Sequence, residues 1–198
     1  MIDIGGPDDE IRSRIERLCQ LVSVVAESSP GLRVSLVSYG AHSVSRRLRE
    51  EPVNVHAWAV QGAVAVRSLE GLNPDAAAEM TPAYRRAAEI ECALAEVARR
   101  LTGQREPVAL VTVGARPAFP ARMASDSPTL PCPLRNDWET ILHRLCHHRR
   151  VALGAIVSDH GAVGEVWTQL SVIPEVLLVS RRQPGAGPGR GGGQHLIR

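Results

Sequence analysis

The sequence contains no lysine, because all 23 of its basic residues are arginine. This absence excludes a phosphate-loop lysine, a Schiff-base lysine and a lysine general base. Aromatic residues make up only 3% of the 198 residues, so the core must be mainly aliphatic and few rings are available to stack on nucleic-acid bases. The net charge of +2 is too small to indicate a nucleic-acid or membrane partner, and we expect neither.

The sequence also lacks a C-x-x-C pair, a basic leader and any apolar run approaching about 18 residues. We therefore expect reduced, free thiols in a soluble, cytoplasmic protein. Among the cysteines, Cys132 stands between two prolines and is expected to be exposed and inert. The complete set is Cys19, Cys92, Cys132 and Cys146.

The most informative stretch is residues 107–117, which read Pro-Val-Ala-Leu-Val-Thr-Val-Gly-Ala-Arg-Pro. A continuous apolar run that ends at glycine and then proline predicts a strand buried on both faces, as in a parallel sheet. Ligands of open α/β sheets bind beyond the carboxyl ends of such strands. The loop over residues 114–120 is therefore the first place to look for a function.

Strands and helices are expected to alternate along the rest of the chain. Further strands are predicted at residues 1–4, 32–39, 53–60 and 151–157, with an edge strand at 175–180. Helices are predicted after Pro7, from Thr81 to near Gly103, after Asn136 or Asp137, and around residues 163–170. Residues 63–69 fit either a strand or the opening of a helix, and residues 115–134 form a long loop.

This order predicts an α/β fold: a three-layer sandwich with a mostly parallel central sheet and helices on both faces. Residues 1–180 are expected to form one domain. Residues 181–198 are rich in glycine, proline and arginine and are expected to be a disordered tail.

Three segments carry a resemblance to a known family: residues 88–94 (Ala-Glu-Ile-Glu-Cys-Ala-Leu), 111–117 (Val-Thr-Val-Gly-Ala-Arg-Pro) and 132–138 (Cys-Pro-Leu-Arg-Asn-Asp-Trp). With the order of strands and helices, they resemble a von Willebrand factor A-like, broadly Rossmann-like domain of actinobacterial type. Such domains belong to conflict or signalling systems that pair them with proteases and ATPases. The resemblance covers residues 1–179 and implies that the short first strand lies at the centre of the sheet.

The resemblance also implies where a divalent cation would bind in a metal-dependent member. Asp3 matches the acid after the first strand and Thr81 can match the later threonine, but Gly5 and Pro7 stand where two serines belong. After the strand at 107–113, Arg116 brings positive charge where an acid would stand. Octahedral oxygen coordination needs more donors than these loops offer, so we expect a degenerate site with no metal and no cofactor.

We therefore expect a non-catalytic module that binds another protein through a rim of loops. The candidate rim residues are Asp3, Gly5, Tyr39, Thr81, Gly114, Arg116 and Arg135. The two arginines are candidates for gripping a carboxylate of the partner. Two alternatives remain: a small divalent-metal-dependent α/β hydrolase or phosphotransfer enzyme that uses Asp3, and a truncated or decayed domain.

Two other patterns carry less weight. His143 and His147 share a helix face, as zinc-binding pairs do, but a solvated polar face explains them better. The consecutive Ser158, Asp159 and His160 suggest a turn, because adjacent side chains at a strand end diverge and cannot line up as a catalytic triad.

Overall fold

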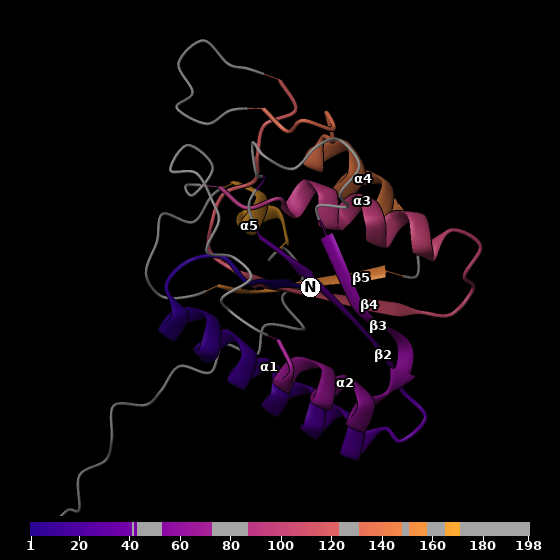
Figure 1. Ribbon diagram of the computed structural model, residues 1–198. Coiled ribbons are helices and arrows are strands. Elements are labelled where there is room, and N and C mark those ends of the chain that lie inside the picture. The colour runs from indigo at the N-terminus through magenta and orange to yellow at the C-terminus, as the bar shows by residue number, and fades with distance from the viewer. Residues whose placement is uncertain are drawn as a thin grey trace, which may run out of the picture.

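The chain folds around one five-stranded, mostly parallel β-sheet (Figure 1). The computed structural model describes residues 1–40, 42, 53–72, 87–122, 131–147, 151–157 and 165–170. The strand order is β3-β2-β1-β4-β5, and only β3 runs antiparallel to its neighbour. The strands are β1 (Ile2–Asp3), β2 (Arg33–Tyr39), β3 (Val53–Gln61), β4 (Val108–Gly114) and β5 (Val151–Val157).

The apolar run that predicted a buried strand forms β4. It pairs in parallel with β5 along its whole length and with β1 at Val113. Leu110 packs with residues of α3 (Ile90–Leu101) and α4 (Trp138–His147), whereas Val113 belongs to a second cluster with Leu18 and Leu69. The strand is therefore covered on both faces, which explains its continuous apolar sequence.

The two-residue strand β1 lies at the centre of the sheet, between β2 and β4. Backbone hydrogen bonds fix it on both sides: Val113 N donates to Met1 O and Ile4 N donates to Tyr39 O, each at 2.9 Å. The next residue after fully buried Ile2 is Asp3, which this pairing places at the carboxyl end of the sheet.

Helices cover both faces of the sheet. Figure 1 shows α1 (Asp8–Ser28) and α2 (Gly62–Glu70) on one side, and α3, α4 and α5 (Glu165–Leu170) on the other. The start of α1 follows from its sequence, because Pro7 precedes three acidic residues that favour the positive helix end. Between α1 and α2 the backbones approach closely, since a Cβ on Gly62 would lie 2.3 Å from Cβ of Ala26.

Most predicted elements are confirmed, and β3 is the partly exposed edge strand that its alternation indicated. Residues 63–69, which fitted two structures, lie in helix α2. The helix expected to begin at Thr81 is a partial error, because α3 begins at Ile90 and Ala87 and Ala88 precede it. Ala88 instead bridges to Ala118, and its N–H donates to Pro117 O at 2.8 Å.

Some expectations fall on residues outside the described part of the chain. These are the Ser158 to His160 turn, the edge strand at 175–180, the tail at 181–198, and Thr81 itself. Within the described residues, none of the helices combines the length and apolar character needed to cross a membrane.

Candidate functional site

The ends of three neighbouring strands meet at the carboxyl edge of the sheet. Asp3 ends β1 and is in register with Tyr39, the last residue of β2. Gly114 ends β4 on the other side of β1, and a Cβ at that position would lie 2.8 Å from Cβ of Asp3. The carboxylate of Asp3 is therefore surrounded by the loops that leave these strands, as sequence reasoning expected of a rim.

The guanidinium of Arg116 binds the carboxylate of Asp3 at two points. Its Nε donates to Oδ2 at 2.9 Å, and its Nη2 donates to Oδ1 at 2.5 Å. The same group donates to the carbonyl oxygens of Gly40, at 2.9 Å, and Ala87, at 3.1 Å. One arginine thus joins the segments after β1, β2 and β4 to the segment before α3.

This ion pair is buried. The side chain of Asp3 is fully buried and that of Arg116 is only 13% exposed. Burial opposes the charged form of Arg116, but the facing carboxylate of Asp3 outweighs it and raises the pKa of the guanidinium above its ordinary value. Arg116 therefore carries its positive charge in the folded protein, directly against the carboxylate group of Asp3.

Glycines at two positions leave the room that this pair needs. A Cβ on Gly5 would lie 2.1 Å from Nη2 of Arg116, and a Cβ on Gly114 would lie 3.0 Å from the ring of Trp167. The N–H of Gly5 also donates to Oδ1 of Asp3 at 2.9 Å. Gly5 therefore both contacts the carboxylate and admits the guanidinium, which no residue with a side chain can do without displacement.

A second buried arginine binds the backbone of the turn that follows β1. Arg14 of α1 is only 2% exposed, and its Nη1 donates to the carbonyl oxygens of Asp3, at 3.1 Å, and Gly5, at 2.9 Å. Its Nη2 pairs with Glu10 at 2.7 Å. On the other side, Trp167 Nε1 donates to the carbonyl of Arg116 at 2.7 Å. The backbone on both sides of the ion pair is therefore held by buried donors.

The divalent-cation site implied by the family resemblance does not fit these residues. Gly5 and Pro7 supply no side-chain oxygen, and Arg116 donates to both carboxylate oxygens of Asp3. Mg²⁺ requires a near-octahedral set of oxygens at about 2.0–2.1 Å, and the guanidinium lies where such an ion would meet Asp3. A cation bound to Asp3 would have to displace the guanidinium of Arg116.

The remaining rim candidates differ in their surroundings. Tyr39 is fully buried, and burial followed by the charge of Asp3 raises the pKa of its hydroxyl well above the ordinary value. Arg135 is exposed, in a turn before α4 where its φ of 55° is left-handed. Thr81 lies outside the described residues, so no contact of it is described.

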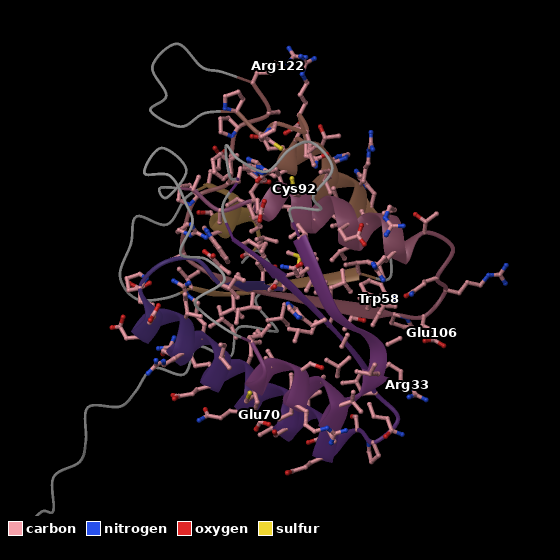
Figure 2. All side chains as sticks on the ribbon, viewed as in Figure 1. Arg33, Trp58, Glu70, Cys92, Glu106 and Arg122 are labelled. Carbon is pink, nitrogen blue, oxygen red and sulfur yellow. The ribbon has the colours of Figure 1, made fainter. Side chains whose placement is uncertain are left out.

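A second cluster lies beside this rim, and the sequence did not predict it. His42 follows β2, Glu91 and Cys92 lie in the first turn of α3, and Cys132 precedes α4. All four are buried, and their ligating atoms lie within 4.8 Å of one another. Figure 2 shows Cys92 on α3, on the side of the sheet away from α1 and α2.

The distances within the cluster are short. Nε2 of His42 lies 2.8 Å from Oε1 of Glu91 and 3.8 Å from Sγ of Cys92. Sγ of Cys92 lies 3.7 Å from the same oxygen of Glu91 and 3.6 Å from Sγ of Cys132. The cluster thus unites one nitrogen, one carboxylate oxygen and two sulfurs from segments that are far apart in sequence.

Further side chains hold the cluster in place. Oε2 of Glu89 lies 3.2 Å from Nδ1 of His42, while the N–H of Gly40 donates to Oε1 of Glu89 at 3.1 Å. The N–H of Phe119 donates to Oε2 of Glu91 at 3.3 Å, and Nδ2 of Asn136 donates to Sγ of Cys92 at 3.3 Å. The ring of Phe119 packs on His42 with centroids 4.7 Å apart.

Burial and mutual contact shift the pKa values of these groups. Burial alone would lower the pKa of His42, but hydrogen bonds to Cys132 and Glu91 and the nearby carboxylates raise it to about 9. The hydrogen bond from Cys92 lowers the pKa of Cys132, and the same contact, with burial, raises that of Cys92. Burial raises the pKa of Glu91.

The prediction that Cys132 is exposed is wrong, because its relative exposure is only 2%. Its N–H donates to Pro120 O at 2.9 Å, and its Sγ lies 3.6 Å from Sγ of Cys92 on α3. The exposed cysteine is Cys146. The structure has no disulfide among the four cysteines.

The histidines of α4 lie on an exposed surface of that helix. His143 and His147 are both exposed, and their Nε2 atoms lie 2.7 Å apart. This placement fits the solvated polar face that the sequence favoured for them.

Comparisons with known proteins add no relative. No protein-family model matches the chain, and neither a curated protein nor a solved structure is similar to it at a significant level.

The cluster left only a weak signal in the sequence. Ligating residues that follow one another along the chain are 40 to 50 positions apart, except for the adjacent Glu91 and Cys92. Zinc motifs are usually recognised by pairs of ligands a few residues apart, and this chain has no such cysteine pair. What joins the segments is the sheet, which places the loops after β2 and before α4 against the start of α3.

Proposed function

We propose that the protein is a non-catalytic protein-interaction module: a three-layer α/β sandwich of the von Willebrand factor A-like class, acting in a bacterial multi-protein conflict or signalling system. The fold is compatible with this class. The short first strand lies at the centre of a mostly parallel sheet with helices on both of its faces, as the resemblance implied.

The observation that carries the proposal is the ion pair between Arg116 and Asp3. A permanent positive charge, held by hydrogen bonds to Asp3, Gly40 and Ala87, faces the carboxylate and ties together the loops at the carboxyl edge. A bound divalent ion would also place positive charge beside this carboxylate and tie oxygen atoms of these loops together. The rim can therefore keep its shape without metal, and its binding should be independent of Mg²⁺.

The same pair argues against the alternative in which Asp3 acts in hydrolysis or phosphotransfer. A carboxylate nucleophile needs an accessible lone pair and a reacting atom close to it. Asp3 is fully buried, and both of its oxygens accept hydrogen bonds from Arg116.

The surface available to a partner lies on the exposed turn before α4. Leu134 is 46% exposed and Arg135 projects from a left-handed backbone position. Beside this turn, a hollow of about 200 Å³ lies between Leu134, Asn136 and the outer face of α3. Arg135 therefore replaces Arg116 as the arginine that grips a partner carboxylate, since the charge of Arg116 is directed at Asp3. The partner we expect offers an acidic group beside an apolar side chain.

The experiment compares capture of a partner by the wild-type chain and two matched variants. Arg135→Glu reverses an exposed charge on the turn, and Arg105→Glu reverses an exposed charge before β4, at the opposite edge of the sheet. Figure 2 shows Glu106, the neighbour of Arg105, far from Arg122 and from Cys92. A protein captured from the source cells is then purified, and its affinity is measured in Mg²⁺-free buffer and with millimolar Mg²⁺.

We expect Arg135→Glu to abolish binding of the purified partner, Arg105→Glu to retain it, and Mg²⁺ to leave the affinity unchanged. Binding that requires Mg²⁺, or that survives Arg135→Glu and fails with Arg105→Glu, would contradict the proposal.

A further inference from the structure

We propose a structural zinc site with four protein ligands: His42, Glu91, Cys92 and Cys132. This proposal rests on the buried cluster, whereas the proposed function rests on the ion pair between Arg116 and Asp3. An experiment can therefore refute one proposal without refuting the other. Imidazole nitrogen, carboxylate oxygen and thiolate sulfur are the ligands that zinc takes in proteins. Two thiolates in the set favour zinc over Mg²⁺ or Ca²⁺, which prefer oxygen alone.

The separations between the ligating atoms fit a tetrahedron around zinc. With Zn–S bonds of about 2.3 Å and Zn–N or Zn–O bonds of about 2.0–2.2 Å, two sulfurs lie about 3.8 Å apart, and a sulfur lies about 3.6 Å from a nitrogen or an oxygen. The two Sγ atoms are 3.6 Å apart, and Sγ of Cys92 is 3.8 Å from His42 Nε2 and 3.7 Å from Glu91 Oε1. Three of the edges of the tetrahedron are therefore already formed.

The edge between His42 and Glu91 differs, because Nε2 and Oε1 are only 2.8 Å apart. That is a hydrogen-bond distance, so a proton joins these two atoms where an ion would otherwise separate them. All four ligands bind zinc in their deprotonated forms, and the protons pass to solvent. Opening this contact by about half an ångström would bring it to the length of a tetrahedral edge. The two remaining edges, from Sγ of Cys132 to His42 and to Glu91, are within 4.8 Å.

The surroundings of the cluster are those of a metal site. Histidines that bind zinc usually offer their second ring nitrogen to a carboxylate, which fixes the ring and its tautomer. Glu89 is placed for this role, because its Oε2 lies within ion-pair distance of Nδ1 of His42, at 3.2 Å. Asn136 points its amide at Sγ of Cys92, and the N–H of Phe119 holds the oxygen of Glu91 that does not face His42.

Four protein ligands with no open position define a structural site rather than a catalytic one. The ion would fasten the loop after β2 and the loop before α4 to the start of α3. Cys92 also lines the hollow beside Leu134, which gives an ion a route from the surface. The site would therefore fix the position of the turn that carries Arg135.

The test measures zinc in the full chain, purified in reducing buffer without a chelator. Metal content is determined by mass spectrometry, and the dissociation constant by competition with a chromophoric chelator. The variants are Cys92→Ser and Cys132→Ser, with the exposed Cys146→Ser as the matched control. The double variant His143→Gln/His147→Gln removes an exposed histidine pair of α4 at which zinc could also attach.

We expect one zinc ion per chain, retained in Cys146→Ser and in the histidine double variant. Cys92→Ser or Cys132→Ser should weaken zinc binding at least about 100-fold, since even partners that only orient a ligand are worth about 10–100-fold. Glu89→Gln tests such an orienting role and should weaken binding about 10–100-fold.

A cobalt spectrum of the wild-type chain keeps the test decisive if the cysteine variants do not fold. Co²⁺ in this site should give thiolate-to-metal charge transfer and the intense visible bands of tetrahedral coordination. A spectrum without thiolate bands, zinc that disappears with the histidine double variant, or a Cys92–Cys132 disulfide in the freshly purified protein would each overturn the assignment.

Discussion

Arg116 and Asp3 form a two-point ion pair across 113 positions of the sequence, at the carboxyl edge of the central sheet. The guanidinium also bridges neighbouring segments, as a bound ion would, because it donates to the backbone carbonyls of Gly40 and Ala87. A covalently attached cation cannot dissociate, so the loops that it joins keep their arrangement whatever the supply of divalent metal. Four predictions follow from the side chains around this pair and from the helix beside it.

Removing the guanidinium should leave a buried, uncompensated charge. We expect Arg116→Met to lower the free energy of unfolding by about 3–5 kcal/mol, the usual cost of breaking a buried ion pair on one side. Asp3→Asn/Arg116→Met should cost less than the sum of its single variants, because the pair is lost only once. Chemical denaturation measures both, with the exposed Arg12→Met as control, and additive costs would contradict the coupling.

Adding a methyl group at Gly5 should displace the guanidinium. The new Cβ would lie 2.1 Å from Nη2 of Arg116, so Gly5→Ala should cost about 1–3 kcal/mol, as overpacking does. Gly31→Ala is the control, because nothing lies within 4 Å of its added Cβ. Equal stabilities of the two variants, measured by thermal unfolding, would show that Arg116 does not fill the space beside Gly5.

Trp167 should contribute through its indole N–H as well as its ring. The N–H donates to the carbonyl of Arg116 at 2.7 Å, and the side chain is fully buried. Trp167→Phe should therefore cost about 1–3 kcal/mol, the range for a buried polar group that loses its partner. The control is Trp58, whose ring centroid lies 5.1 Å from Cζ of Arg100. Trp58→Phe keeps an aromatic ring against this arginine and should cost less than about 1 kcal/mol. The opposite ranking in urea denaturation would contradict this role.

Glu96 should make stability depend on acid. A hydrogen bond from Arg99, with one from Arg100, lowers the pKa of Glu96 from 4.5 to about 2. Since the folded pKa is depressed, the carboxylate stabilises the fold above about pH 4.5, and this contribution is lost as the pH falls toward 2. Glu96→Gln should therefore cost up to about 1 kcal/mol at neutral pH and only a small part of that at pH 2. A difference that stays constant over this range would exclude the assigned titration.

The sheet was largely predictable because its signals are local. The continuous apolar runs over β4 and β5 predicted buried strands, and the alternation of apolar and polar residues in β3 predicted an edge strand. The start of α3 was missed because Ala87 and Ala88 have high helix propensity, whereas tertiary hydrogen bonds to Pro117 hold Ala88 in a bridge. Helix propensity is a local property, so it cannot predict the hydrogen bond from Ala88 to Pro117, which is 29 residues away.

The candidate site was only partly predictable. The rule that ligands bind beyond the carboxyl ends of strands indicated the loop that holds Gly114 and Arg116, and the family resemblance indicated Asp3. Neither could show that the charge of Arg116 is directed inward at Asp3 rather than outward at a partner. The prolines around Cys132 suggested exposure, but a hydrogen bond to Pro120 turns that thiol inward, and only the folded chain brings it to Cys92.

The most direct test of the account is a thermal unfolding scan of the wild-type chain with and without millimolar Mg²⁺. This ion prefers oxygen ligands and avoids thiolates, so it reports on the rim around Asp3 and not on the cysteine cluster. A ligand present at 100 times its dissociation constant stabilises the native state by about 2.7 kcal/mol. We predict a cooperative transition whose midpoint is unchanged by Mg²⁺. An upward shift that Asp3→Asn abolishes would contradict the claim that Arg116, rather than a cation, pairs with Asp3.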